Sequence, residues 1–233
     1  MKNKKSLVSL ICIFSILLVG CNINNNSSNN INNNTPISSS NTNNSTSNKH
    51  SYLDDYKQYF YTKNTPIAYT GSAETGHKIT FNNIESVNDY ALYTYDGLMN
   101  DGYGQDIRGK RTFTAKYKVT NDMVIESINN NDYISKNKDT LHSFIKDFIV
   151  LKGEIKKDNS WTQKTIIDGV EYEAITTITE KNDTSFTTET VIKDLSFENG
   201  KYYTETRTYE LGKGLIYFSY LNNPYLEISY SLI

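Results

Sequence analysis

Cysteine is scarce in this chain, and its scarcity excludes a disulfide-stabilised scaffold. The 233 residues include only 2 cysteines, Cys12 and Cys21, whereas small secreted scaffolds depend on several disulfide pairs. Cys12 lies within an apolar stretch at the start of the chain, so Cys21 is the only cysteine in the remainder. We therefore expect the fold to be stabilised by its core alone.

Basic clusters and catalytic motifs are missing as well. No block of Lys or Arg stands out after the first five residues, which argues against a nucleic-acid partner and against a polybasic patch for anionic lipids. The chain has no G-x-S-x-G, P-loop, H-E-x-x-H or C-x-x-C motif. We therefore expect no catalytic residues, no cofactor and no metal site.

The start of the chain has the layout of a secretory signal peptide. Lys2, Lys4 and Lys5 precede the apolar run Leu7–Val19, which is shorter than the roughly 20 residues that a membrane-spanning helix needs. A retained membrane anchor is thus less favoured than cleavage. Removal of the three lysines changes the formal net charge from -2 to -5.

The segment Leu18-Val19-Gly20-Cys21 resembles a bacterial lipobox. By that resemblance Cys21 becomes the lipidated first residue of the mature protein, carrying diacylglyceryl and palmitate. Two or three acyl chains hold a protein stably on a membrane, whereas one chain is marginal. We expect a lipid anchor on the extracytoplasmic face of the cell membrane. Secretion after cleavage at another site is the competing interpretation.

Three parts follow from this reading. Residues 1–20 form the signal peptide, residues 21–50 the lipidated cysteine and a disordered tether, and residues 51–233 a β-rich extracytoplasmic domain. The tether is almost entirely Asn, Ser and Thr, which do not bury enough apolar surface to offset the cost of ordering. Its coil reach is roughly 30 Å, so it would lift the domain into the wall layer.

Abundant tyrosine and threonine, with only 3 prolines among the 233 residues, favour strands. Apolar and polar residues alternate clearly in three stretches, as half-buried antiparallel strands do: Arg111–Val119, Val170–Ile178 and Leu226–Leu232. Turn signals separate the runs and predict a meander: Asn121-Asp122, Asp168-Gly169, Asn182-Asp183, Asn199-Gly200 and Asn222-Asn223-Pro224.

Two segments show helical spacing of apolar residues. His50–Tyr61 predicts a short amphipathic helix that starts near Ser51 and is broken by Thr65-Pro66, and Asp139–Leu151 predicts a short helix that runs into a strand. The predicted fold class is mainly β: a single curved antiparallel sheet or half-barrel of roughly ten strands, with one or two short helices packed on it.

Three stretches resemble a loose group of Firmicute, especially clostridial, lipoproteins of unassigned function. They are Asp55–Phe60 with Asn64 and Tyr69–His77, then Leu151-Lys152 with Trp161, and then Tyr209–Ile216. That group carries a "YF…N…Y.G.AE.GH" opening, a "LK.PL..G..W" middle and a "Y..G.GL" ending. Here Gly153-Glu154-Ile155 replaces the Pro-Leu of the middle motif. The resemblance implies an extracytoplasmic β-rich domain and implies no catalytic residues.

The remaining candidate ligands have ordinary structural explanations. Glu74 and His77 have the E-x-x-H spacing of helical metal sites, but glycines flank them, so we expect a strand or turn in which His77 hydrogen-bonds or lies exposed. The acidic loop 96–106 offers oxygen ligands for calcium without EF-hand spacing. His50 and His142 complete no zinc site.

Aromatic and acidic residues offer a second set of candidates. Trp161 and Tyr202, Tyr203, Tyr209, Tyr217 and Tyr220 are expected to pair across strands, with a sugar-stacking or lipid-facing surface as the alternative. Glu171, Glu173, Glu189 and Glu205 mostly alternate with apolar positions and are expected on a solvated face.

Three functions remain open at this point. The first is a non-catalytic binding or structural domain outside the cell, directed at wall polymer or a protein. The alternative is a carrier of a lipid or other apolar ligand in the concave face of the sheet, which needs an uncovered apolar concavity. A cell-wall hydrolase is weaker, since it needs two carboxylates converging in a cleft.

Overall fold

The structure, a computed structural model, describes residues 50–71, 76–99, 112–129, 141–196, 202–223 and 226–233. All of them belong to one of the chain's two units, Ser47–Ile233. The signal peptide, Cys21 and nearly all of the tether lie outside the described residues, as do Glu74, the turn Asn199-Gly200 and the acidic loop after Met99.

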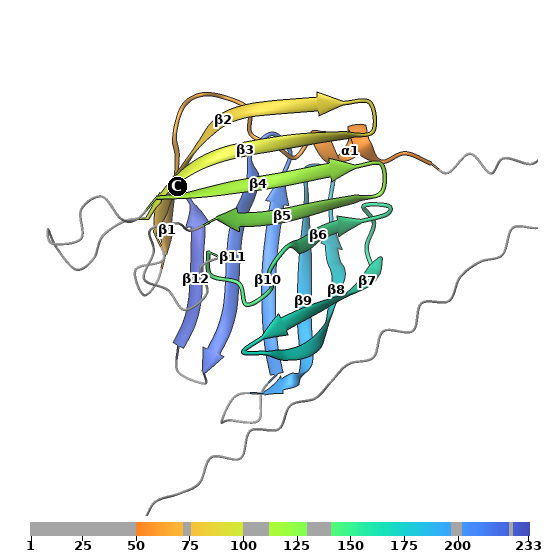
Figure 1. The fold of residues 1–233 in the computed structure, drawn as a ribbon, viewed down its shortest axis with the longest axis vertical. Helices are drawn as coiled ribbons and strands as arrows, with labels where there is room; N and C mark the ends of the chain where they lie inside the picture. The colour runs from red at the N-terminus through yellow and green to blue at the C-terminus, as the bar shows by residue number, and fades with distance from the viewer. Residues whose placement is uncertain (1–49, 72–75, 100–111, 130–140, 197–201, 224–225) are drawn as a thin grey trace, which may run out of the picture. The chain divides into compact units, whose positions relative to one another are not determined.

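The described residues form one antiparallel sheet of 12 strands, in the order β6-β5-β4-β3-β2-β1-β12-β11-β10-β9-β8-β7, nearly closed into a barrel (Figure 1). This confirms the predicted fold class, with more strands than expected. The strands are β1 Ile67–Gly71, β2 His77–Val87, β3 Tyr90–Met99, β4 Thr112–Thr120, β5 Met123–Asn129, β6 Phe148–Lys152, β7 Ser160–Ile167, β8 Val170–Lys181, β9 Ser185–Ser196, β10 Tyr202–Glu210, β11 Gly214–Asn223 and β12 Leu226–Leu232.

A short strand joins the two halves of the sheet. Strands β2–β5 run across the direction of β8–β12, and β1 lies at the corner between them (Figure 1). Tyr69 of β1 pairs with His77 of β2 on one side and with Leu232 of β12 on the other. The sheet therefore folds over onto itself and encloses its inner face.

Side chains bridge the two ends of the sheet where β6 and β7 approach each other. The backbone N–H of Ile149 donates to Gln163 Oε1 at 2.7 Å, and Trp161 Nε1 donates to the carbonyl of Ile149 at 3.0 Å. Both side chains come from β7 and are buried. They satisfy backbone groups of β6 that would otherwise be left at a free sheet edge.

The strand predictions hold in most positions. On β4, Phe113, Ala115 and Val119 are buried, as the alternation predicted, and β12 buries Ile228 and Tyr230. The stripe on β8 is confirmed from Ala174 to Ile178, but Val170 is 52% exposed. This prediction was wrong because Val170 begins β8 at a hairpin tip, where nothing in the described chain covers it.

Three predicted turns lie wholly within the described residues and fall between strands. Of the turn predicted at Asn222-Asn223-Pro224, Asn222 and Asn223 belong to the end of β11 and Pro224 lies outside the described residues. Asp168 and Gly169 join β7 to β8 with φ of 50° and 82°, the positive values that a two-residue hairpin requires. Asn182 follows β8, and its Oδ1 accepts hydrogen bonds from the backbone N–H groups of Thr184 and Ser185. Asn121-Asp122 connects β4 to β5.

The amphipathic helix is real but shorter than expected. The helix, α1, spans Leu53–Lys57, and the backbone N–H of Gly212 donates to the carbonyl of Gln58 just after it. Ending the helix there lets Tyr59 pack edge-on against Phe186 and lets Phe60 stack on Tyr93 at 4.2 Å between ring centroids. Tertiary packing of these rings outweighs helical spacing.

The second predicted helix is wrong over the described residues 141–147, although the strand that follows it, β6, is confirmed. Asp147 has a positive φ of 47°, which a helix does not tolerate. Ser143 and Ile145 are buried in the barrel instead. The apolar spacing therefore reflects an irregular segment that fills the interior.

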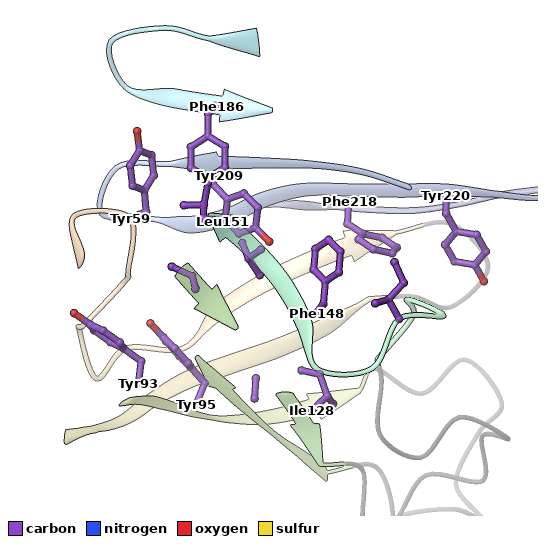
Figure 2. Packing of buried hydrophobic residues seen from close by; sticks show 14 of the residues in the cluster. Tyr59, Tyr93, Tyr95, Ile128, Phe148, Leu151, Phe186, Tyr209, Phe218 and Tyr220 are labelled. Carbon is purple, nitrogen blue, oxygen red and sulfur yellow. The ribbon is translucent and has the colours of Figure 1, made fainter. Parts of the chain in front are cut away.

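Aromatic rings dominate the core, and Figure 2 shows buried side chains from both halves of the sheet turned toward a common interior. Phe218 stacks on Tyr230 with centroids 4.8 Å apart, and Phe186 stacks on Tyr209 at 5.1 Å. The pairs Phe186–Tyr209 and Tyr203–Tyr220 confirm the cross-strand pairing that was expected of Tyr203, Tyr209 and Tyr220. Trp161, Tyr203, Tyr209 and Tyr220 are buried, whereas Tyr202 is exposed.

Gly97 shows how tightly β3 and β4 are packed. It lies directly opposite Phe113 in the register, and a Cβ at position 97 would overlap the ring atoms of Phe113. We expect Gly97→Ala to destabilise the protein by about 1–3 kcal/mol through overpacking, measured by urea unfolding. In the double variant with Phe113→Ala the two losses should be clearly less than additive. Full additivity would contradict this contact.

Candidate functional site in the barrel interior

Strand β10 carries charged residues into the barrel. Its inward-facing side chains are Tyr203, Glu205, Arg207 and Tyr209, and all four are buried. The prediction that Glu205 lies on a solvated face was wrong, whereas Glu171, Glu173 and Glu189 are exposed as expected. The spacing in the sequence could have revealed the burial of Glu205. Every second residue of a strand lies on the same face, so Glu205 shares a face with the aromatic residues Tyr203 and Tyr209.

Arg207 lies between two carboxylates from different parts of the chain. Its Nη1 donates to Glu126 Oε1 of β5 at 2.9 Å, and its Nε donates to Glu205 Oε1 at 2.5 Å. The guanidinium also packs against the ring of Phe148 at 4.2 Å and lies 5.4 Å from the ring of Phe218. These are the contacts expected of a buried arginine: paired charges and aromatic faces.

Hydroxyl groups complete the hydrogen bonding of both carboxylates. Tyr117 donates to Glu126 Oε2 at 2.7 Å. Ser143 donates to Glu205 Oε2 at 2.6 Å, and Tyr203 donates to the same oxygen. Three donors surround the carboxylate of Glu205, which has no exposed surface. The cluster satisfies the rule that buried charges are paired and hydrogen-bonded.

Electrostatics favour a charged arginine and neutral tyrosines in this cluster. Burial lowers the pKa of Arg207, but the carboxylates of Glu126 and Glu205 more than offset this and hold the pKa well above its ordinary value. Burial raises the pKa of Tyr117 and Tyr203 far above that of free tyrosine, and the carboxylate beside each one raises it further. Each of these tyrosines therefore remains a hydrogen-bond donor.

The cavity described inside the barrel is small. A cavity of about 60 Å³ lies beside Arg207, whereas sites for small molecules measure roughly 300–1,000 Å³. Its lining is largely aromatic and includes Tyr69, Tyr95, Tyr209 and Tyr230. The cluster thus has room for a few ordered waters, which need about 10–15 Å³ each.

His77 lies in this core rather than in an exposed turn. It begins β2, is 3% exposed, and stacks on Tyr69 with centroids 4.5 Å apart. The alternative that His77 lies exposed was therefore wrong, because β2 turns this residue inward. His142 approaches it at 6.2 Å between ring centroids. Among the described residues, no three His, Cys, Asp or Glu gather to hold a metal ion.

A larger concavity lies outside, next to α1. This groove of about 570 Å³ is lined by the helix and by the loops that follow β6, β8 and β10. Its carboxylates are Asp55, Glu154 and Asp183, accompanied by Lys181. Tyr59 lines both the groove and the inner cavity and thereby forms part of the wall between them.

Comparisons with known proteins add little to this picture. No protein-family model and no curated protein matches the chain. A search of solved structures found a Bacteroides fragilis protein described as exported, with a YmcC-like fold, at TM-score 0.42 and 10% identity. It also found a Parabacteroides distasonis protein described as a lipoprotein, at TM-score 0.38 and 11% identity. Each alignment covers 75% of this chain and 96% of the other.

No helix within the described residues has the length and apolar character to cross a membrane. Of loop 96–106, the candidate for calcium binding, the structure describes residues 96–99, the end of β3. There Asp96 accepts a hydrogen bond from Asn82 Nδ2 at 2.8 Å.

Removal of Arg207 tests the ion cluster. Arg207→Met leaves two carboxylates buried without a counter-charge, so we expect a loss of about 3–5 kcal/mol in the free energy of unfolding, measured by urea denaturation. Adding Glu126→Gln and Glu205→Gln should recover a large part of the loss. Glu189→Gln on the exposed face is the control and should change little. A loss from Arg207→Met no larger than this control's would contradict the proposed pairing.

Alkaline titration tests the buried tyrosines. Burial raises their pKa above the value of 10.0 for free tyrosine, so the folded state keeps protons that the unfolded state loses. Stability is then fully present below about pH 10 and falls above it by about 1.4 kcal/mol per pH unit for each fully buried tyrosine. Tyrosinate absorbance and urea unfolding measure this. Ionisation of all tyrosines near their ordinary pKa without unfolding would refute it.

Proposed function

We propose that this chain is a bacterial lipoprotein, anchored through lipid on Cys21 to the extracytoplasmic face of the cell membrane. Its β domain acts there without catalysis, as a binding or structural module. The lipobox-like segment and the Asn/Ser/Thr tether support the location. The resemblance to clostridial lipoproteins agrees with it.

The filled interior is the observation that carries the non-catalytic reading. Within the described interior of the barrel, Glu126 and Glu205 are the carboxylates that converge, and both are engaged by Arg207. A hydrolase needs carboxylates that reach a substrate in a cleft, and Glu205 has no exposed surface. We take the role of this cluster to be ordering the fold, which leaves the outer surface for partners.

The same observation weighs against a lipid carrier. An acyl chain needs an apolar concavity of ligand size, and the inner cavity of about 60 Å³ is a fraction of that. α1 and the segment 141–147 occupy the inner space that a lipid would need: Tyr56 and Ile145 are both buried. We therefore favour a partner outside the barrel over a ligand within it.

The anchor is tested by labelling cells with palmitate. The native chain should take up the label, fractionate with membranes and be degraded by protease added to intact cells. Cys21→Ser should lose the label because the acyl chains need the thiol of Cys21. Cys12→Ser, which alters the other cysteine, is the matched control and should label normally. An unlabelled native chain, or one protected from protease, would overturn the proposal.

A further inference from the structure

Hydroxyl groups form two adjacent rows across the outer face of the sheet, and we call them the hydroxyl rows. The first row crosses β7 to β12 and consists of Ser160, Thr177, Glu189, Thr206, Ser219 and Ser229. The second crosses β8 to β12 and β1 and consists of Glu180, Thr187, Thr208, Tyr217, Ser231 and Thr70. In each row five of the six residues bear a hydroxyl.

These side chains point away from the core. On β10, Glu205 and Arg207 are buried while Thr206 and Thr208 between and beside them are half-buried. Successive residues of a strand face opposite sides of the sheet, so the whole of each row lies on the outer face. Every residue in the two rows is half-buried or exposed.

The sheet holds the hydroxyls in a regular grid. Neighbouring strands lie about 4.7–4.9 Å apart, and two residues along a strand span about 6.5–6.8 Å. Some of the hydroxyls order one another: Thr187 Oγ1 lies 3.0 Å from Thr208 Oγ1, and Ser160 Oγ lies 3.0 Å from Thr177 Oγ1. The grid is therefore set before any ligand arrives, which lowers the entropic cost of binding.

The charge of the side chains in the two rows indicates which class of partner could bind there. Neither row contains Lys or Arg, and the only charged members are Glu180 and Glu189. A polyanion with phosphate groups finds no counter-charge there and meets two carboxylates. A hydroxyl both donates and accepts hydrogen bonds, so the grid matches a partner that is uncharged and rich in hydroxyl groups.

An exposed ring lies on the outer face of β10, four residues and therefore about 13 Å before Thr206 of the first row. Tyr202 precedes Thr204, Thr206 and Thr208 along β10 and is 53% exposed, whereas its neighbour Tyr203 is fully buried. Aromatic rings pack against apolar faces while their hydroxyl stays in water. Sugar rings offer such apolar faces as well as hydroxyls.

We propose that the hydroxyl rows, with Tyr202, bind an extended, uncharged polysaccharide strand. This rests on the proposed function for its setting, because a lipid anchor at Cys21 would hold the domain outside the cell, close to the glycan of the wall. The complex depends on many weak hydrogen bonds made together along the strand.

The test uses the mature chain, residues 21–233, and insoluble chitin as an uncharged probe polymer, in a pelleting assay. The native chain should bind chitin, and the double variant Thr206→Val with Ser219→Ala should bind about tenfold more weakly, as expected for two lost hydrogen bonds. Valine keeps the β-branched shape that suits a strand. Tyr202→Ala, on the surface, should weaken binding independently.

Thr114→Val is the matched control, because Thr114 is a half-buried, outward-facing threonine on β4 in the other half of the sheet. It should bind chitin like the native chain. Three outcomes would each overturn this inference. The native chain does not bind chitin, it binds polyglycerol phosphate more strongly than chitin, or the double variant and Tyr202→Ala both bind chitin as strongly as the native chain does. Palmitate labelling at Cys21 tests the proposed function separately, so the two can fail independently.

Discussion

One buried arginine holds the two halves of this sheet together. Arg207 of β10 reaches Glu126 of β5 across the interior and Glu205 within its own strand. Ser143, from the segment between the halves, donates to Glu205 as well. Strand β5, strand β10 and the segment 141–147 therefore meet at one charged cluster. A shift of any one of them would break contacts that the other two make.

Such a cluster contributes more to specificity than to stability. Desolvation of buried charges offsets much of their attraction, so a well-packed apolar core is often as stable. Misplacing the charges is costly, however. A one-residue slip of β10 would carry Glu205 and Arg207 to the outer face and bring Thr206 inward, leaving Glu126 buried without its partner. We infer that the cluster fixes the register of β10 against β9 and β11.

Sequence patterns predicted the parts of the fold that obey one simple period. The alternation on β4 placed Phe113 and Val119 correctly because one of its faces is apolar throughout. The same reasoning failed for Glu205, since charge is normally a sign of exposure. Its counter-charge Arg207 also binds Glu126, which is distant in the chain, so the sequence does not reveal that the three residues meet. The reasoning failed again at residues 141–147. There the apolar residues have the spacing of a helix, but the segment is irregular and packs its apolar side chains into the interior. The two hydroxyl rows were not recognised, because they exist only once the register joins seven strands.

Strand β10 shows how the core and the surface are specified independently. Its odd-numbered residues from Tyr203 to Tyr209 build the interior, whereas Thr206 and Thr208 belong to the outer rows. A change at Thr206 leaves the contacts of Arg207 intact, because the two side chains lie on opposite faces. The outer face is thus free to vary with its partner while the ion cluster holds the sheet. The small size of the cavity beside Arg207 agrees with that division, because the interior side chains described there are occupied with one another.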